Sequence, residues 1–270
     1  MFAALQQRRI TSGPILLAVL AACAIATGCG RSPGTEKIIV QGASGRLGSL
    51  VAEALLEMRV PAENLIPVSR TPEKLSQFAR LGAATRYGDF TEPDSLAQAY
   101  AGGTHMLLIS MGGGRGRRAQ LHAGAIDAAV AAGVKHSAYT SHVNADKFAS
   151  SVIAPDHRAT EQHLRDSGVA WTMLRNSIYM NGLVEEAAAV SGAETHYRAM
   201  SEAEHIAALI AAGRTEAAAR GQLGFRAELN SPYLRVVSTA VEDLTGRPPT
   251  SLRTLLGANR QRLQAAANGQ

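Results

Sequence analysis

The sequence predicts an α/β fold whose core is a doubly wound parallel sheet. Between residue 37 and about residue 177, short apolar runs typical of buried strands alternate with longer segments whose apolar residues recur at helical spacing. The first run leads directly into a glycine-rich turn and a helix. With 270 residues, 46% hydrophobic and 18% charged, the chain can bury a substantial core. Repeated units of this length require parallel strands, with ligands at their carboxyl ends.

The elements follow from this alternation. We expect strands over residues 38–40, 64–69, 84–87, 105–110, 134–140 and 170–174. Helices are expected over residues 47–58, 72–81, 94–100, 118–132 and 155–167, with Thr71 as the N-cap of the second. The patterns weaken after Tyr179, where helices are expected only over residues 202–212 and 234–245. We therefore predict a Rossmann-type domain over residues 35–178 and a small, reduced C-terminal substrate lobe over residues 179–270.

Residues 1–34 have the composition of an export leader. Arg8 and Arg9 precede an apolar stretch that ends in small residues. Both cysteines of the chain, Cys23 and Cys29, lie in this segment, and the residues before Cys23 resemble a bacterial lipobox. We expect an exported or membrane-anchored lipoprotein with a lipid on Cys23 or Cys29; the alternative is a start site placed too early and a cytoplasmic protein. After the leader no cysteine remains for a disulfide or a nucleophile.

Three glycines, Gly42, Gly45 and Gly48, stand where the first strand gives way to the first helix. The start of a helix offers amide hydrogens and partial positive charge, so a phosphate is a natural ligand there. The spacing is G-x-x-G-x-x-G rather than the better known G-x-G-x-x-G. We expect this turn to bind the diphosphate of a dinucleotide, and the alternative is a plain glycine-rich turn. The residues expected to bind it are Gly42, Ser44, Gly45, Arg46, Leu47 and Gly48.

Arg70 follows the second strand, where a site for NAD usually carries an acid that binds the ribose diol. An arginine at this position accommodates a 2′-phosphate instead, and Lys74 can assist it. The sequence therefore predicts NADP(H) in preference to NAD(H). The alternative is an ordinary surface arginine and lysine.

The next two strands end in further candidates for the cofactor site. Asp89 and Phe90 are expected near the adenine, with ordinary turn chemistry as the alternative. Ser110 and Met111 are expected to line the middle of the cofactor. Residues 112–118 are rich in glycine and arginine, and form either a flap over the phosphates or a plain flexible loop.

Hydroxyl and amide side chains end the fifth and sixth strands. The hydroxyls of Tyr139, Thr140 and Ser141 are candidates to face a nicotinamide, and Asn176 is a candidate to orient its carboxamide. These residues complete the predicted cofactor site on the nicotinamide side.

His157 and Glu161 are four residues apart and so share one face of the predicted helix over residues 155–167. A histidine here can donate a proton to a carbonyl oxygen undergoing reduction. We therefore predict His157 and Ser141 as catalytic residues. The alternative is a helix start whose acids complement the helix dipole, with His157 exposed.

Other chemistries are excluded by what the sequence lacks. It has no Cys or His cluster at zinc spacing, no H-E-x-x-H motif and no P-loop lysine. The net charge is +5, but aromatic residues make up only 4% and no RNA-binding signature is present. We expect no metal and no nucleic-acid partner, and interpret the arginines as solvated or facing an anionic cofactor.

The motifs together resemble the NmrA-like group of atypical short-chain dehydrogenase/reductases, and most closely its NAD(P)H:quinone oxidoreductase type 2 branch. The matching segments are IIVQGASGRLG, VSRTPEK, GDF, LLIS, AAGVKHSAYTS, DHRATEQHLRDSGVAWTMLRN and LTGRPPTSL. The resemblance implies hydride transfer from NADPH to a quinone or similar small carbonyl acceptor, with Arg70 on the 2′-phosphate and Thr140, Ser141 and Asn176 near the nicotinamide. The alternative is a non-catalytic NmrA-type sensor of NADP(H).

Catalysis in this group differs from that of ordinary short-chain dehydrogenases. The group lacks the Tyr-x-x-x-Lys pair of ordinary members, and here His157 and Glu161 have that four-residue spacing. A quinone needs little acid catalysis, so stacking against the nicotinamide can suffice. The chain departs from the family pattern in two ways. The segments 181–195 and 214–230 are short, which predicts a shallow acceptor pocket. The leader is the second departure, because NADPH is made in the cytoplasm.

Overall fold

The computed structural model describes residues 36–112, 116–147, 151–180, 184, 200–229 and 231–267. The predicted leader, with Cys23 and Cys29, lies outside the described residues, as does part of the glycine- and arginine-rich loop. Among the described residues, no helix combines the length and apolar character needed to cross a membrane.

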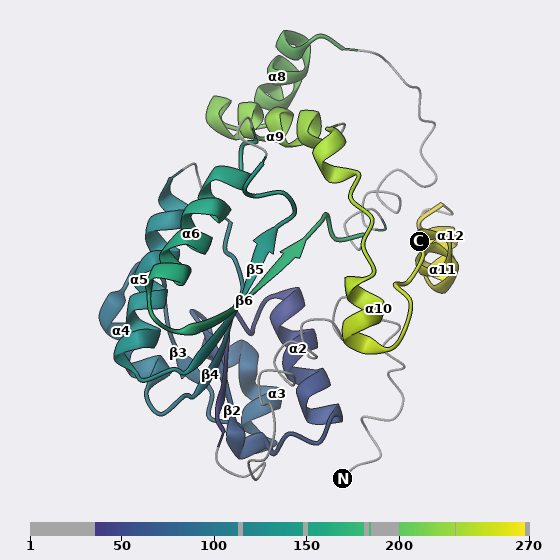
Figure 1. Cartoon of the computed structure of the whole chain (residues 1–270). Helices are drawn as coiled ribbons and strands as arrows, with labels where there is room; N and C mark the ends of the chain where they lie inside the picture. The colour runs from purple at the N-terminus through teal and green to yellow at the C-terminus, as the bar shows by residue number, and fades with distance from the viewer. Residues whose placement is uncertain are drawn as a thin grey trace.

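Six parallel strands form one sheet in the order β3-β2-β1-β4-β5-β6 (Figure 1). The strands are β1 (Ile38–Gln41), β2 (Leu65–Ser69), β3 (Arg86–Tyr87), β4 (His105–Leu108), β5 (His136–His142) and β6 (Ala170–Asn176). The chain leaves β1 toward β2 on one side and later returns to β4 on the other. The direction of winding reverses between β1 and β4, which is where such sheets bind ligands. The predicted doubly wound α/β fold is confirmed.

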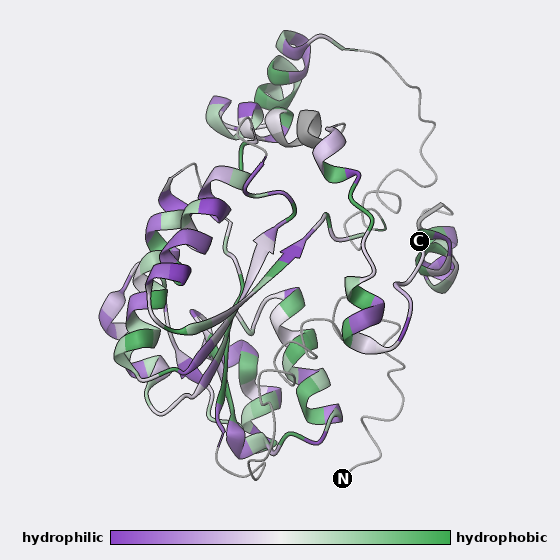
Figure 2. Cartoon of the chain, viewed as in Figure 1, coloured by the Kyte–Doolittle hydropathy of each residue, from purple (hydrophilic) through white to green (hydrophobic). Residues whose placement is uncertain are grey.

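Alternation along the strands divides the core into two layers, one on each face of the sheet. The first layer contains Val40, Val51 and Leu107, together with the buried side of α2 (Arg46–Glu57) and α3 (Ser76–Ala79). The second contains Ile39 and Tyr139, under α4 (Pro93–Tyr100), α5 (Arg117–Ala131) and α6 (Ala154–Asp166). Figure 2 shows hydrophobic and hydrophilic residues alternating along α2 and α6, as expected for helices with one face on a sheet.

The predicted helix over residues 72–81 was too long. It is a 3₁₀ turn, η2 (Pro72–Leu75), followed by the single-turn α3. Thr71 occupies the N-cap position of η2, as predicted, but its side chain makes no cap hydrogen bond, and its N–H donates to Ser69 Oγ at 2.9 Å. A further 3₁₀ turn, η1 (Ala62–Asn64), precedes β2.

The C-terminal part is helical. It contains α8 (Glu202–Ala211), α9 (Glu216–Leu229), η3 (Pro232–Leu234), α10 (Ala240–Thr245), α11 (Leu252–Ala258) and α12 (Arg260–Ala267). The helix expected over residues 234–245 forms only as α10, while α9, α11 and α12 were not predicted. A Cβ on Gly224 would lie 2.7 Å from Val152 Cγ1, so α9 packs closely on the segment before α6. Asn144 donates to the Tyr233 carbonyl and joins η3 to the end of β5.

Candidate functional site

The glycine turn is fastened to the neighbouring strand by its backbone. Gly42 and Ala43 both donate N–H bonds to the Val68 carbonyl of β2, at 3.0 and 2.9 Å. Gly42 has a φ of +87°, a left-handed conformation that favours glycine. The turn therefore has a fixed course between β1 and α2.

The first backbone amides of α2 lie directly after the glycine turn. Ser49 donates the first helical bond, to the Gly45 carbonyl at 2.9 Å, so the amides of residues 46–48 precede the helical ladder. Gly45 is the N-cap and makes no side-chain cap hydrogen bond, and the first turn contains no acid. The positive end of the helix dipole is thus left for an anion.

The glycines of this turn have different roles. A Cβ on Gly48 would lie 2.3 Å from the Gly42 carbonyl oxygen and 2.7 Å from Ala43 Cα, so only glycine permits this packing of helix on strand. A Cβ on Gly45 would meet only the Gly42 oxygen, at 3.3 Å, and the φ there is −75°. Gly45 therefore leaves space on the ligand side of the turn, and Gly48 keeps the turn closed.

A pair of serines links the glycine turn to the end of β2. Ser44 Oγ lies 2.6 Å from Ser69 Oγ, which also accepts the Thr71 N–H. Arg70 lies between Ser69 and Thr71 in the sequence. Its side chain is 70% exposed, and its Nε lies 4.0 Å from Asp89 Oδ2. Lys74, in η2, is also exposed. Two basic side chains therefore stand at the same edge as the glycine turn.

Asp89 uses one carboxylate oxygen locally and turns the other toward Arg70. Oδ1 accepts the Thr91 N–H at 2.8 Å and the Thr91 hydroxyl at 2.9 Å, which is the turn chemistry considered as the alternative. Phe90 is half-buried, and its ring centroid lies 5.7 Å from that of His122. Both residues lie at the carboxyl edge of the sheet, and their contact with adenine stays a prediction.

The end of β4 is held from the opposite side by β5. The Ser110 N–H donates to Thr140 Oγ1 at 2.7 Å, and the Thr140 hydroxyl lies 3.3 Å from Ser110 Oγ. Thr140 therefore joins the ends of β4 and β5, at the edge where the sequence placed both residues.

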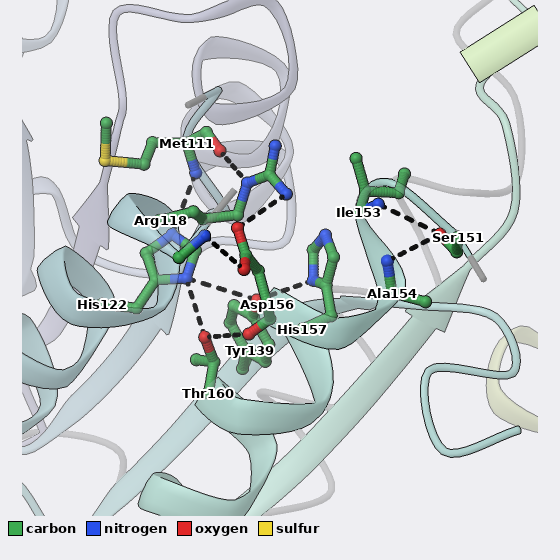
Figure 3. Close-up of polar contacts among 11 residues, drawn as sticks. Met111, Arg118, His122, Tyr139, Ser151, Ile153, Ala154, Asp156, His157 and Thr160 are labelled. Atoms are coloured by element: carbon green, nitrogen blue, oxygen red, sulfur yellow. Dashed lines mark hydrogen bonds and ion pairs between the residues drawn. The ribbon is translucent and has the colours of Figure 1, made fainter. Parts of the chain in front are cut away.

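Both peptide groups of Met111 are bound by buried side chains of α5 (Figure 3). Its N–H donates to His122 Nε2 at 3.1 Å, and its carbonyl accepts from Arg118 Nε at 2.8 Å. Asp156, at the start of α6, accepts the Gly116 N–H at 2.8 Å, and its Oδ2 lies 3.7 Å from an Arg118 nitrogen. We call Arg118, His122 and Asp156 the loop-anchoring cluster, since they hold both ends of the loop after β4.

His157 is buried within a hydrogen-bonded group beneath this cluster. Its Nδ1 lies 2.7 Å from the Tyr139 hydroxyl, which is also 3.3 Å from His122 Nδ1. Only 6% of His157 is exposed, so the alternative of an exposed histidine is wrong. Burial, and next the charge of Arg118, lowers the pKa of both His122 and His157 to about 3. Both imidazoles are therefore neutral at neutral pH.

Ser141 has a different neighbour. Its hydroxyl donates to Glu161 Oε1 at 2.6 Å, and this fully buried carboxylate also accepts from Arg175 and Arg165 at 2.7–2.8 Å. Burial alone raises the pKa of Glu161, but the hydrogen bonds from Arg175 and Ser141 outweigh it and leave the pKa below its usual value. His157 and Glu161 thus have separate partners, and the catalytic assignment of Ser141 stays a prediction.

Asn176 ends β6, and its amide donates to the Tyr179 hydroxyl at 3.0 Å. Sequence reasoning missed Gln41, whose buried Oε1 has no hydrogen-bond partner in the described part of the chain. It also missed the roles of Arg118, His122 and Asp156. The available signal was polar residues at helical spacing with the buried alanines of α5.

The fold and the site together define a dinucleotide-binding protein of the Rossmann class, because the glycine turn lies where the winding of the sheet reverses. The chain belongs to the NAD(P)H-binding family, which it matches over residues 42–216.

Among curated proteins, it is 39% identical over 152 residues to quinone oxidoreductase 2 of Escherichia coli K12, covering 56% of this chain and 52% of that protein. It is 28% identical over 165 residues to an NAD(P)H azoreductase of Xenophilus azovorans, covering 61% and 56%. These alignments span only about half the length of each relative.

Solved structures extend the likeness over more of the chain. The structure of the E. coli NADPH-dependent quinone oxidoreductase QOR2 complexed with NADPH has a TM-score of 0.71 at 27% identity, over 82% of this chain and 99% of that one. The Citrobacter triphenylmethane reductase complexed with NADP(H) has a TM-score of 0.66, with the same identity and coverage. The resemblance inferred from the motifs is confirmed.

Proposed function

We propose that this protein binds NADPH at the carboxyl ends of β1, β2 and β4 and transfers hydride to a quinone or a similar small acceptor. The observation that carries the proposal is the glycine turn: the amides of residues 46–48 precede the helical ladder of α2, and only glycine fits at position 48. A turn of this kind suits the diphosphate of a dinucleotide.

The residues around the turn fit the phosphorylated form of the cofactor. Gly45 has no side chain to hold a diphosphate away from the start of α2. Arg70 and Lys74 are exposed and cationic beside the turn, where a 2′-phosphate would lie. Asp89 Oδ2 lies 4.0 Å from Arg70 Nε. The NADPH and NADP(H) complexes of the structural relatives support this preference.

When bound, the reduced nicotinamide supplies the hydride. The chain supplies position: Thr140 and Ser110 fix the strand ends, and Asn176 stands at the end of β6. His157 is neutral, so it acts as a hydrogen-bonding group rather than as a charged acid. In the overall reaction a quinone takes one hydride from NADPH and one proton from solvent to give a hydroquinone. Proximity provides most of the rate in such a reaction.

The named relatives support a class of acceptor. They are described as reductases of quinones, azo compounds and triphenylmethane dyes, which are all conjugated electron acceptors. We therefore propose a conjugated acceptor, of which a quinone is the first to test.

The test is steady-state oxidation of NADPH, and of NADH in parallel, with a panel of quinones and one azo dye. Turnover that prefers NADPH is the expected result. Tight NADPH binding with no turnover on any acceptor would favour the non-catalytic sensor. A folded protein that binds neither dinucleotide in calorimetry would refute both.

A further inference from the structure

We propose that the loop-anchoring cluster sets the affinity of the nicotinamide half of the cofactor site, although none of its three residues ends a strand or belongs to the glycine turn. Arg118, His122 and Asp156 would act as positioning residues through the main chain that follows β4. This inference rests on the proposed NADPH site and adds a determinant of its affinity.

First, both backbone polar groups of Met111 are hydrogen-bonded. Its N–H and its carbonyl are each bound by a different side chain of α5. With both groups held, the peptide planes around Met111 cannot rotate without breaking a hydrogen bond to a buried side chain. The backbone that follows β4 therefore has one orientation.

The second step is that the far end of the loop is tied to the same cluster. The Gly116 N–H donates to Asp156, and Asp156 is ion-paired with Arg118. Arg118 is 7% exposed and Asp156 4%, so the pair is shielded from solvent and from salt. One buried ion pair thus connects Met111 on one side with Gly116 on the other.

The third step fixes the chemical state of His122. Its Nε2 accepts from an amide, so this nitrogen carries no proton, and Nδ1 is the donor toward Thr160 and Tyr139. Only a neutral imidazole can fill both roles, and complete burial of His122 favours that form. A side chain without an acceptor at this place would leave the Met111 amide unsatisfied.

The fourth step places this loop relative to a dinucleotide. In a dinucleotide bound at this switch point, the adenosine half would lie over β1 and β2, beside Arg70, and the nicotinamide half would lie over β4 and β5. Met111 follows β4, so a change in its orientation affects the second half and leaves the first. This asymmetry separates a positioning role from a purely structural one.

The experiment measures two ligands by calorimetry on the full chain. NADPH spans both halves, whereas 2′,5′-ADP occupies only the adenosine half. His122→Leu removes the acceptor for the Met111 amide and is expected to weaken NADPH about tenfold, the value of roughly one hydrogen bond. Binding of 2′,5′-ADP is expected to stay unchanged. His122→Gln restores an acceptor and is expected to recover most of the NADPH affinity.

Arg118→Lys is the second variant, because it keeps a cation beside Asp156 but removes the Nε–H that reaches Met111. Arg118→Lys is expected to show the same selective loss of NADPH affinity. It therefore tests the inference even if His122→Leu does not fold. Wild-type NADPH affinity in both variants would overturn the inference, as would an equal loss of NADPH and 2′,5′-ADP. If the wild-type protein binds NADPH but shows no turnover, the proposed reaction is refuted and this inference is not. If the wild-type protein binds no NADPH, both are refuted.

Discussion

Acid should destabilise this protein through two histidines buried in the neutral form. His122 is fully buried and His157 is 6% exposed, and burial lowers the pKa of both from 6.5 to about 3. Between these two pH values the unfolded chain takes up a proton on each imidazole and the folded chain does not. The unfolded state therefore binds more protons, and stability falls as the pH falls from 6.5 toward 3.

The magnitude follows from the size of the interval. At pH 5 the pH is 1.5 units below the pKa of 6.5 that each histidine has in the unfolded chain. This difference corresponds to about 2 kcal/mol of unfolding free energy for each side chain. Because both imidazoles stay neutral in the folded state, the two contributions add to about 4 kcal/mol. This is a large fraction of the roughly 5–15 kcal/mol that stabilises a typical domain.

Urea unfolding followed by circular dichroism at pH 8 and pH 5 measures this difference. His122→Gln and His157→Gln should each reduce the loss of unfolding free energy by about 2 kcal/mol. His163→Gln, which removes a more exposed imidazole of α6, is the matched control. The buried His105 and the half-buried His136, whose pKa values are also lowered by burial, add to the wild-type loss but cancel in the comparison. An identical loss in wild type and both variants would refute the reasoning.

Three further outcomes are expected. Arg70→Asp should weaken NADPH at least tenfold more than NADH in calorimetry, since it reverses the charge beside a 2′-phosphate, whereas Arg80→Asp, on an exposed residue after α3, should not discriminate between them. Gly45→Val should abolish dinucleotide binding in a protein that still folds, while Gly48→Ala should lower the melting temperature, because its Cβ meets backbone at 2.3 Å; unimpaired binding by Gly45→Val would mean that the turn is wrongly assigned. Glu161→Gln should cost about 3 kcal/mol of unfolding free energy in urea, because Arg175 and Arg165 lose a buried counter-charge, and Ser141→Ala about 1 kcal/mol; equal costs for the two would contradict this account.

The sheet could be predicted because its signals are local. Each strand is a short apolar run followed by a turn, and the glycines at positions 42, 45 and 48 identify the first crossover. The predicted ends of two strands differ from the observed ones because pairing between strands extends beyond the apolar runs. β5 and β6 remain paired as far as His142 and Asn176.

The polar interior could not be predicted in the same way. Asp156 meets Gly116 across forty positions, and nothing in either segment indicates the other. His122 and Arg118 have the spacing of a helix face, but the sequence does not show whether that face meets solvent or core. Helix α9 was missed because it contains Gly221 and Gly224, which lower helix propensity; the second is required by contact with Val152.

The double attachment of the glycine turn has a consequence for recognition. Gly42 and Ala43 share the Val68 carbonyl, and Ser44 is joined to Ser69, so the parts that would meet the diphosphate and the ribose phosphate move as one body. The loss of conformational freedom needed to shape this half of the crevice is therefore completed when the chain folds. When a nucleotide binds, only the nucleotide itself still has to lose conformational freedom. The affinity is higher because the protein has no such cost left in this half of the site.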